Sequence, residues 1–313
     1  MKILGIETSC DETAAAIVED GTKIISNVVA SSQAMHAKFG GIIPEQAARE
    51  QVKSIIPVID EALVCEIDAI GVTYGPGLIG SLLVGVETAK ALAFAWNKPI
   101  VPVNHLIGHI YANWINDTPE FPALVLLVSG GHSELILMKD HGDFEFLGGT
   151  RDDAAGECFD KCARVLNLGY PGGPAVEAAA SKFTINNLQF TIKLPRPMIN
   201  EKSFDFSFSG LKTAVLYRKN EDPNGMAFEL QEAITDVLVK KTLLAAEKFK
   251  VKNILLAGGV AANKRLREKL PQAICPQINL CTDNADYIAS AAFFNYEPVS
   301  WKQIQADPGL DIN

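Results

Sequence analysis

The sequence contains few histidines and cysteines for its length. Of 313 residues, five are His and six are Cys. The cysteines form no CxxC pair and no regular framework, so we expect reduced, buried thiols and no disulfides. Cys158 and Cys162 have a spacing that metal ligands also use, but they share an apolar stripe with Val165 and Leu166, which favours core packing. The six cysteines are residues 10, 65, 158, 162, 275 and 281.

Long uncharged apolar runs and an excess of positive charge are also missing. No stretch of about 18 such residues appears, and no basic and apolar leader precedes the strand-like "KILGIE", so we expect a cytoplasmic protein. The net charge of −9 argues against non-specific coating of nucleic acid, because that mode needs many Lys and Arg contacts to phosphate. A local basic patch or a partner subunit remains compatible with it. The length and the 48% apolar content predict two domains.

One strand, turn, strand pattern occurs twice. Near the N-terminus the apolar "ILGI" is followed by the polar "ETSCDET" and then by "AAAIV". About 120 residues later "ALVLLV", "SGGHSE" and "LILM" repeat this plan. We predict a duplicated domain in which each copy opens with a hairpin and both turns face one cleft.

Strands followed by glycine turns and helices recur between and after the hairpins. "DAIGVTYGPG" leads into the helical "LIGSLLVGVETAKALAFAW", and a helical pattern over 226–249 leads into "NILLAGGVAANKRLREKL". This alternation predicts an α/β architecture. Residues 181–212 follow neither the strand period of two residues nor the helical period of 3.6, so they are predicted to form an irregular excursion.

Two glycine turns favour a nucleotide-type ligand. "SGGH" at 129–132 and "AGGVAAN" at 257–263 each follow an apolar strand, where backbone N–H groups can point at phosphate oxygens. Neither matches the Walker or dinucleotide fingerprint, and each alone reads as an ordinary tight turn. Their combination with "YGPG" and "YPGGP" favours the interpretation that the protein binds a nucleotide-type ligand.

The segment "VNHLIGHIYANW" holds two of the histidines. His105 and His109 lie four positions apart, on one face of a predicted helix, which suits two imidazoles on one metal. The alternative is that both bond to neighbouring backbone. A metallopeptidase needs Glu directly after the first His, but Leu106 stands there. Asp283 in "CTDNAD" is the candidate third ligand, with a helix N-cap as the alternative.

Three carboxylates outside this segment are further candidates. Asp11 and Glu12 lie at the tip of the first predicted hairpin, where they can hold water, a metal-bound group or a nucleophile, although Asp is common in turns. Asp160 follows Cys158 by two positions and so turns about 200° from the apolar stripe, toward a cleft or solvent. The basic run "NKRLREKL" reads as a solvated helix surface.

Together these segments closely resemble one family, the tRNA threonylcarbamoyladenosine transferases of the bacterial TsaD type, formerly called glycoproteases. The resemblance covers nearly the whole chain in the family's order. Its motifs here are "GIETSCDETAAAIV", "GGIIPEQAARE", "VTYGPGLIGSLLVG", "NHLIGHI", "LVSGGHSEL", "DDAAGECFDK", "YPGGPAVE", "FSFSGLKTAV", "LAGGVAANKRLR" and "CTDNADYIA".

The resemblance implies an α/β fold of two duplicated ribonuclease-H-like halves around a central nucleotide cleft, as in actin, sugar kinases and heat-shock ATPases. The expected halves are 1–107, which binds a partner, and 108–313, which binds the nucleotide and whose C-terminal helix returns to the first half. The implied reaction transfers threonylcarbamoyl from threonylcarbamoyl-AMP to the exocyclic amine of the adenosine 3′ of the anticodon, in tRNAs that read ANN codons. The implied partners are a paralogous TsaB-type subunit, a small TsaE-type ATPase and tRNA.

Family membership also implies roles for single residues. His105, His109 and Asp283 are expected to bind one divalent metal, with Fe2+ favoured and Zn2+ as the alternative. Asp11 matches a residue needed for activity. The expected substrate-binding residues are Leu127, Val128, Ser129, Gly130 and Gly131 along the phosphate and acyl end of the adenylate, and Asp160, Gly173, Glu177 and Asn263 at its ribose and adenine.

The chain departs from the family pattern at four positions. Gln51 stands where the family usually has His, Ser133 where it has Thr, and Asp286 and Tyr287 where smaller or apolar residues are common.

Three rival functions are a sugar-kinase-like phosphotransferase, a non-catalytic scaffold and a metal-dependent peptidase. The first leaves the His105 and His109 pair unexplained, the second leaves the cleft residues unexplained, and Leu106 weakens the third.

Overall fold

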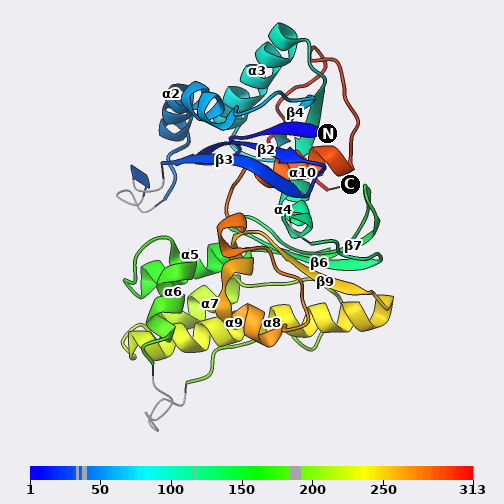
Figure 1. Cartoon of the computed structure of the whole chain (residues 1–313). Helices are drawn as coiled ribbons and strands as arrows, with labels where there is room; N and C mark the ends of the chain where they lie inside the picture. The colour runs from blue at the N-terminus through cyan, green and yellow to red at the C-terminus, as the bar shows by residue number, and fades with distance from the viewer. Residues whose placement is uncertain (33–34, 37–40, 116, 184–191, 313) are drawn as a thin grey trace. The chain divides into compact units, whose positions relative to one another are not determined.

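The computed structural model describes residues 1–32, 35–36, 41–115, 117–183 and 192–312 (Figure 1). Contacts divide the chain into two compact units. This division places 108–119 and 276–313 with the first unit. The halves predicted from the sequence are 1–107 and 108–313, with the C-terminal helix of the second returning to the first. Unit 1 comprises Met1–Pro119, Asp140–Asp143 and Pro276–Asn313, and unit 2 comprises Glu120–Lys139 and Phe144–Cys275.

Unit 1 is built on a five-stranded mixed sheet with the order β3-β2-β1-β4-β5. The first three strands pair antiparallel, while β1, β4 and β5 run parallel. Strands buried on both faces need almost continuous apolar sequence, and β1 and β4 meet this requirement. The strands are β1 Lys2–Glu7, β2 Glu12–Glu19, β3 Lys23–Ser31, β4 Ala69–Gly75 and β5 Ile100–Asn104. The helices are α2 Pro44–Ala62, α3 Ile79–Trp96, α4 His105–Tyr111 and α10 Asp286–Phe294, with 3-10 turns at Ala112–Trp114 and Ile278–Leu280.

Helix α3 is, within the described residues, the one helix long and apolar enough to cross a membrane by length and composition. It carries Glu87 and Lys90, which form an ion pair at 2.7 Å, and its Leu82, Val86 and Ala89 are buried in the core with the β-sheet residues. A core helix that covers a sheet can be as long and as apolar as a membrane span. The packing of α3 against the sheet fits a core helix.

Unit 2 contains a four-stranded sheet with the order β8-β7-β6-β9. Here β6 pairs antiparallel with β7 and parallel with β9. The strands are β6 Ala123–Val128, β7 Ser133–Asp140, β8 Asp143–Gly149 and β9 Asn253–Ala257. The helices are α5 Ala155–Val165, α6 Gly172–Ala180, α7 Ser209–Leu216, α8 Pro223–Phe249 and α9 Lys264–Lys269, with a 3-10 turn at Gly259–Ala262.

The two sheets repeat one topology, which confirms the predicted duplication and fold class. In each unit three consecutive strands lie side by side, and the next strand runs parallel to the first of them and beside it. In unit 2 a parallel bridge from Leu255 to Ile274 continues beyond β9, at the place that β5 takes in unit 1. Both hairpins predicted from apolar runs around a polar turn are present, as β1 with β2 and as β6 with β7.

Glycines allow the elements that carry the histidines and Asp283 to pack closely. A Cβ added to Gly5 on β1 would lie 2.1 Å from the Ala285 carbonyl oxygen, just before α10. A Cβ on Gly108 in α4 would lie 2.6 Å and 2.9 Å from the side chains of Ile288 and Tyr287 in α10. A side chain at Gly5 would therefore force α10 outward, because it meets backbone atoms. A side chain at Gly108 would have to displace the side chains of Ile288 and Tyr287.

Three sequence expectations need correction. The irregular excursion at 181–212 ends earlier, because α7 begins at Ser209; its residues 184–191 lie outside the described part of the chain. Asp283 follows a 3-10 turn, and the residue that caps α10 is Ala285, so the N-cap alternative is wrong. All six cysteines are free, but only three are buried; Cys10, Cys65 and Cys275 are partly exposed.

Candidate metal centre and nucleotide-binding turns

Helix α4 places both histidines on one side of unit 1. It begins at His105 because the Asn104 side chain accepts hydrogen bonds from the N–H groups of Leu106 and Ile107, at 2.8 Å and 3.4 Å. Such an N-cap satisfies two donors that the first helical turn leaves free. The same side chain donates to the Asp311 carbonyl at 3.0 Å, which fixes the start of the helix against the C-terminal segment.

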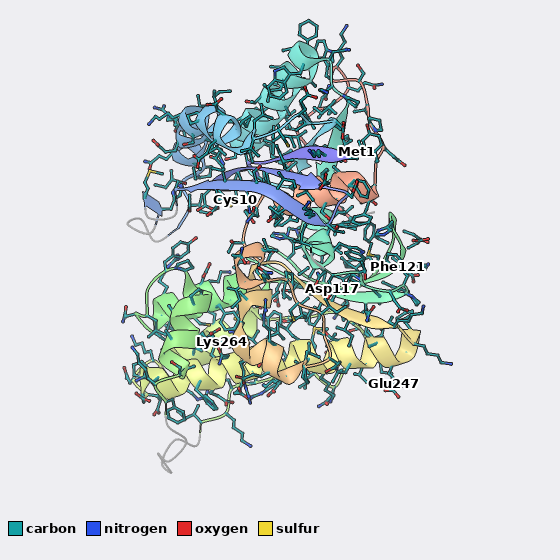
Figure 2. All side chains as sticks on the ribbon, viewed as in Figure 1. Met1, Cys10, Asp117, Phe121, Glu247 and Lys264 are labelled. Carbon is teal, nitrogen blue, oxygen red and sulfur yellow. The ribbon has the colours of Figure 1, made fainter. Side chains whose placement is uncertain are left out.

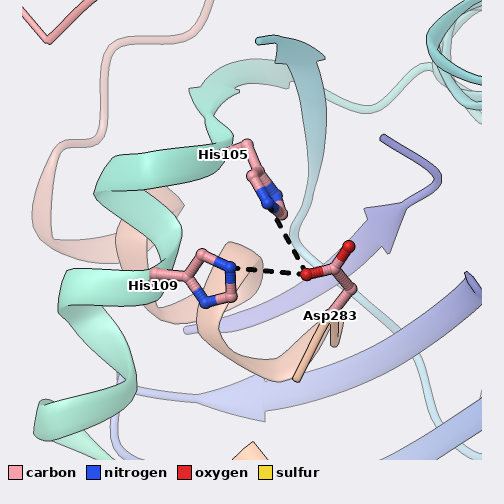
Figure 3. Close-up of side chains that lie close together, drawn as sticks. All are labelled: His105, His109 and Asp283. Atoms are coloured by element: carbon pink, nitrogen blue, oxygen red, sulfur yellow. Dashed lines mark ion pairs between the residues drawn. The ribbon is translucent and has the colours of Figure 1, made fainter. Parts of the chain in front are cut away.

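The structure brings His105, His109 and Asp283 together (Figure 3). The Nε2 atoms of the two histidines lie 3.6 Å and 3.4 Å from one oxygen of Asp283. The side chains of His105, His109 and Asp283 are 12%, 3% and 20% exposed, so the cluster is largely buried and Asp283 is its most exposed member. Within the described residues, this is the one such group of three ligand-type side chains.

The donor set fits a divalent transition metal. Two ligand atoms, each about 2.1 Å from one tetrahedrally coordinated ion, lie about 3.4 Å apart. The two histidine–Asp283 separations are close to this value, and all three ligand atoms lie within 4.8 Å of one another. Two imidazoles and one carboxylate form a set that iron and zinc both accept. The buried Nδ1 of His109 has no hydrogen-bond partner, which leaves Nε2 as the atom through which this ring makes its polar contact.

Electrostatics in the cluster favour one extra positive charge. Burial alone would lower the pKa of His105, but the carboxylates of Glu7 and Asp283 outweigh it and raise that pKa to about 9. Burial lowers the pKa of His109. The pKa of Asp283, which burial alone would raise, is lowered to about 2 by the two imidazoles. A cation, either a proton on His105 or a metal, is thus stabilised between the carboxylates.

Asp11 lies in the turn after β1 that also contains Cys10 (Figure 2). Gln51 from α2 holds this turn: its Nε2 lies within 3.3 Å of the carbonyl oxygens of Thr8, Cys10 and Glu12. Asp11 and Gln51 also line a polar cavity of about 230 Å³. Gln51, one of the four departures from the family pattern, therefore fixes the backbone around Asp11.

Glu12 beside Asp11 keeps its proton to high pH. Burial, a hydrogen bond with Asp11 and the charge of Asp283 raise its pKa to about 9. From its ordinary pKa up to this value the unfolded chain releases the proton while the folded chain retains it, so this group destabilises the fold increasingly as pH rises. We expect Glu12→Gln, in the metal-free chain, to gain stability over the parent between about pH 5 and about pH 8. Urea unfolding at several pH values checks this, and a constant difference would contradict it.

In unit 2 the turn after β6 presents backbone to solvent. Gly130 and Gly131 are exposed, and nothing lies within 4 Å of a Cβ added to either. The Ser129 hydroxyl accepts from the His132 N–H at 3.1 Å, and the Ser129 carbonyl from the Gly156 N–H at 3.2 Å. Leu127 and Val128 are fully buried, so of the five residues predicted in this stretch only Ser129, Gly130 and Gly131 present surface to a ligand.

The remaining predicted substrate residues form a second group in unit 2. Asp160 on α5 accepts a hydrogen bond from the Gly172 N–H at 2.6 Å, beside the open Gly173. The Asn263 amide donates to Glu177 of α6 at 3.1 Å and to Gln231 of α8 at 3.0 Å. Lys264, labelled in Figure 2, donates its N–H to the same Glu177 oxygen.

The sequence interpretation missed several residues of these groups. Gln231 holds the Asn263 amide, but on a long helix its position gives no signal. Glu7 contacts His105 at 2.9 Å, and an acidic residue at the end of an apolar strand was a usable signal. Two of the other departures have local roles: Ser133 Oγ accepts from the Ala155 N–H at 2.8 Å, and the Tyr287 ring packs on His109 with 4.8 Å between ring centroids.

Solved structures with the same fold define the broad class. Full-length HypF in its phosphate- and nucleotide-bound form aligns with a TM-score of 0.63 at 13% identity, over 96% of this chain and 56% of that one. Component A of the Acidaminococcus fermentans (R)-2-hydroxyglutaryl-CoA dehydratase aligns with a TM-score of 0.54 at 18% identity, over 97% and 99%. The protein thus has the actin-like α/β fold.

Sequence comparison gives the family. The family model for tRNA N6-adenosine threonylcarbamoyltransferase, TsaD, matches residues 23–290. The chain is 51% identical to the enzyme of that name from Dehalococcoides mccartyi, over 100% of this chain and 97% of that one. It is 50% identical to the enzyme from Bacillus cereus, over 99% and 96%. The chain belongs to the TsaD family of tRNA N6-adenosine threonylcarbamoyltransferases.

Proposed function

We propose that this chain transfers the threonylcarbamoyl group from threonylcarbamoyl-AMP to the exocyclic amine of the adenosine 3′ of the anticodon, in tRNAs that read ANN codons. The observation that carries the proposal is the cluster of His105, His109 and Asp283 in a chain that matches the transferase family along its length. A sugar kinase on this fold has no use for two imidazoles and a carboxylate around one point.

The three clustered side chains would hold one divalent metal, Fe2+ in preference to Zn2+. When bound, such an ion supplies a positive charge that can anchor a carboxylate or polarise a carbonyl oxygen. The cluster also argues against peptide hydrolysis: Leu106, at the position of the general base in metallopeptidases, is 2% exposed and apolar.

The chain's other residues align and bind the substrates. The acyl donor already carries a good leaving group, so the enzyme must bring the amine to the carbonyl and stabilise developing charge, without a covalent intermediate. Asp11, in a turn fixed by Gln51, is the carboxylate available to accept a proton from the attacking amine. The carbon–nitrogen bond forms as the bond to the phosphate oxygen breaks, and AMP leaves.

The residues of unit 2 suit the adenylate. Exposed backbone N–H groups at Gly130 and Gly131 can donate to phosphate oxygens. Asp160 and Glu177 carry carboxylates that can accept hydrogen bonds from ribose hydroxyls, and Asn263 offers an amide to adenine. Burial raises the pKa of Asp160, and the hydrogen bond from Gly172 opposes this rise.

The partners proposed from the sequence also have a candidate contact surface. Helices α2 and α3 meet where Gly80 faces Ala48, and apolar residues one helical turn apart are exposed on each. These are Val52 and Ile56 on α2, at 63% and 58%, and Ile79 and Leu83 on α3, at 50% and 44%. We propose that this surface binds the paralogous TsaB-type subunit, because exposed apolar patches of this kind mark protein interfaces.

The net charge of −9 supports tRNA binding that is shared with partners. We propose that the isolated chain binds tRNA poorly, because phosphate contacts need Lys and Arg, and that the TsaB-type subunit and the small TsaE-type ATPase complete the assembly. A cytoplasmic location follows from the same proposal, because tRNA is its substrate.

The test is reconstitution of the reaction. The chain is purified without oxygen and incubated with threonylcarbamoyl-AMP, an ANN-reading tRNA and both partner proteins, and digested tRNA is analysed by mass spectrometry for threonylcarbamoyladenosine. We expect the modified nucleoside only with all components, and a large loss when the TsaB-type subunit is omitted. Phosphate transfer from ATP to a small hydroxyl compound, with no modified nucleoside, would overturn the proposal.

A further inference from the structure

Glu7 is a fully buried carboxylate beside the cluster of His105, His109 and Asp283, called the metal-type cluster below. It is the last residue of β1 and is 0% exposed. An acidic side chain is rarely buried so completely unless several donors surround it. Here both of its oxygens accept hydrogen bonds, so its orientation is fixed.

Three donors surround this carboxylate. One oxygen accepts from the N–H of Ser9. The other accepts from the Thr73 hydroxyl at 2.6 Å and faces Nδ1 of His105 at 2.9 Å. The Ser9 hydroxyl also lies 3.2 Å from Nδ1, but a hydroxyl can donate or accept and therefore does not decide where the imidazole carries its proton.

The contact with Glu7 decides the state of the His105 ring. An ionised carboxylate only accepts hydrogen bonds, so Nδ1 must carry the hydrogen. The lone pair that can bind a metal is then on Nε2, the atom that faces Asp283. Carboxylates that hold the second nitrogen of a metal-binding histidine in this way fix both the tautomer and the ring orientation.

We infer that Glu7 is a positioning residue, which holds His105 with Nδ1 protonated and Nε2 directed at the metal-binding point. The inference rests on the proposed metal site. Glu7 serves His105 and not His109, because Nδ1 of His109 has no hydrogen-bond partner. The two histidines are therefore unequal, and His105 is the ligand whose affinity depends on a neighbour.

The isosteric change Glu7→Gln tests this sharply. The N–H of Ser9 requires an oxygen opposite it, so the amide oxygen takes that place and the NH2 group faces His105. The donor and acceptor are then exchanged: Nδ1 must accept, and the hydrogen moves to Nε2, where it blocks the metal. We expect Glu7→Gln to weaken Zn2+ and Co2+ binding about 10- to 100-fold, measured by competition with a chelator.

Two comparisons separate positioning from a general structural effect. Thr73→Val removes another donor to the same oxygen but leaves the acceptor for Nδ1, so its metal affinity should stay near that of the parent. In a His105→Ala background, Glu7→Gln should weaken the residual affinity no further, because the ring on which it acts is absent. In the Zn2+-loaded parent, the Nδ1 proton of His105 should give a downfield NMR signal that disappears in Glu7→Gln.

The possible outcomes discriminate between the inference and the proposed function. Equal metal affinity in the parent and Glu7→Gln overturns the inference alone, as does an equal loss with and without His105. A parent chain that binds neither metal overturns both the inference and the proposed metal centre.

Discussion

Replacing His109 by alanine should remove the bound metal and lower threonylcarbamoyl transfer at least about 100-fold. Mutation of a residue that only supports a metal ligand already costs up to about 100-fold, and loss of the ligand itself should cost no less. The reason is geometric: His109 supplies one of only two imidazoles in the cluster, 3.4 Å from Asp283, and Leu106 and Ile110 beside it are buried and apolar. Metal content by elemental analysis and nucleoside formation by mass spectrometry, on the same preparations, check both effects.

The matched control is His141→Ala. This histidine also belongs to unit 1, but its Nδ1 bonds to the Tyr111 hydroxyl at 2.9 Å, outside the metal-type cluster. We expect one metal per chain and activity close to that of the parent. Retention of metal and activity by His109→Ala would refute the metal centre, and loss of activity with full metal content would give His109 a role other than as a ligand.

The repeated hairpins and the histidine pair could be predicted because both depend on local sequence patterns. Apolar runs on either side of a polar turn mark β1 with β2 and β6 with β7, and the spacing of His105 and His109 depends only on the helical turn. The approach of Asp283 to them is different, since it depends on the packing of α10 against β1 and α4. No local pattern encodes that packing, and Asp283 entered the prediction as a candidate from its own motif.

The residues that support the site were harder to foresee. Gln51 contacts carbonyl oxygens about 40 positions away in the sequence, and Glu7 reaches His105 across 98. Contacts of this range follow from the order of strands in the sheet, so a single sequence shows a polar residue but not its partner. The sequence alone does argue against one function: Leu106 stands where a metallopeptidase has its general base, and this is visible without the position of the helix.

Gly5→Ala should be among the most destabilising single substitutions in unit 1, and it should also weaken metal binding. The added methyl would lie 2.1 Å from the Ala285 carbonyl oxygen and 2.8 Å from the Ala289 nitrogen. Both are backbone atoms, so α10 itself must move. Overpacking of this kind costs about 3 kcal/mol, and Asp283, two residues before Ala285, would shift with the helix.

Urea unfolding of the metal-free chain measures the loss of stability, and chelator competition measures metal affinity. Gly210→Ala is the control, because Gly210 lies on α7 and nothing lies within 4 Å of an added Cβ. There alanine should stabilise the helix by up to about 1 kcal/mol and leave metal affinity unchanged. If Gly5→Ala unfolds at the same urea concentration as the parent and binds metal as tightly, then close packing of α10 on β1 does not position Asp283.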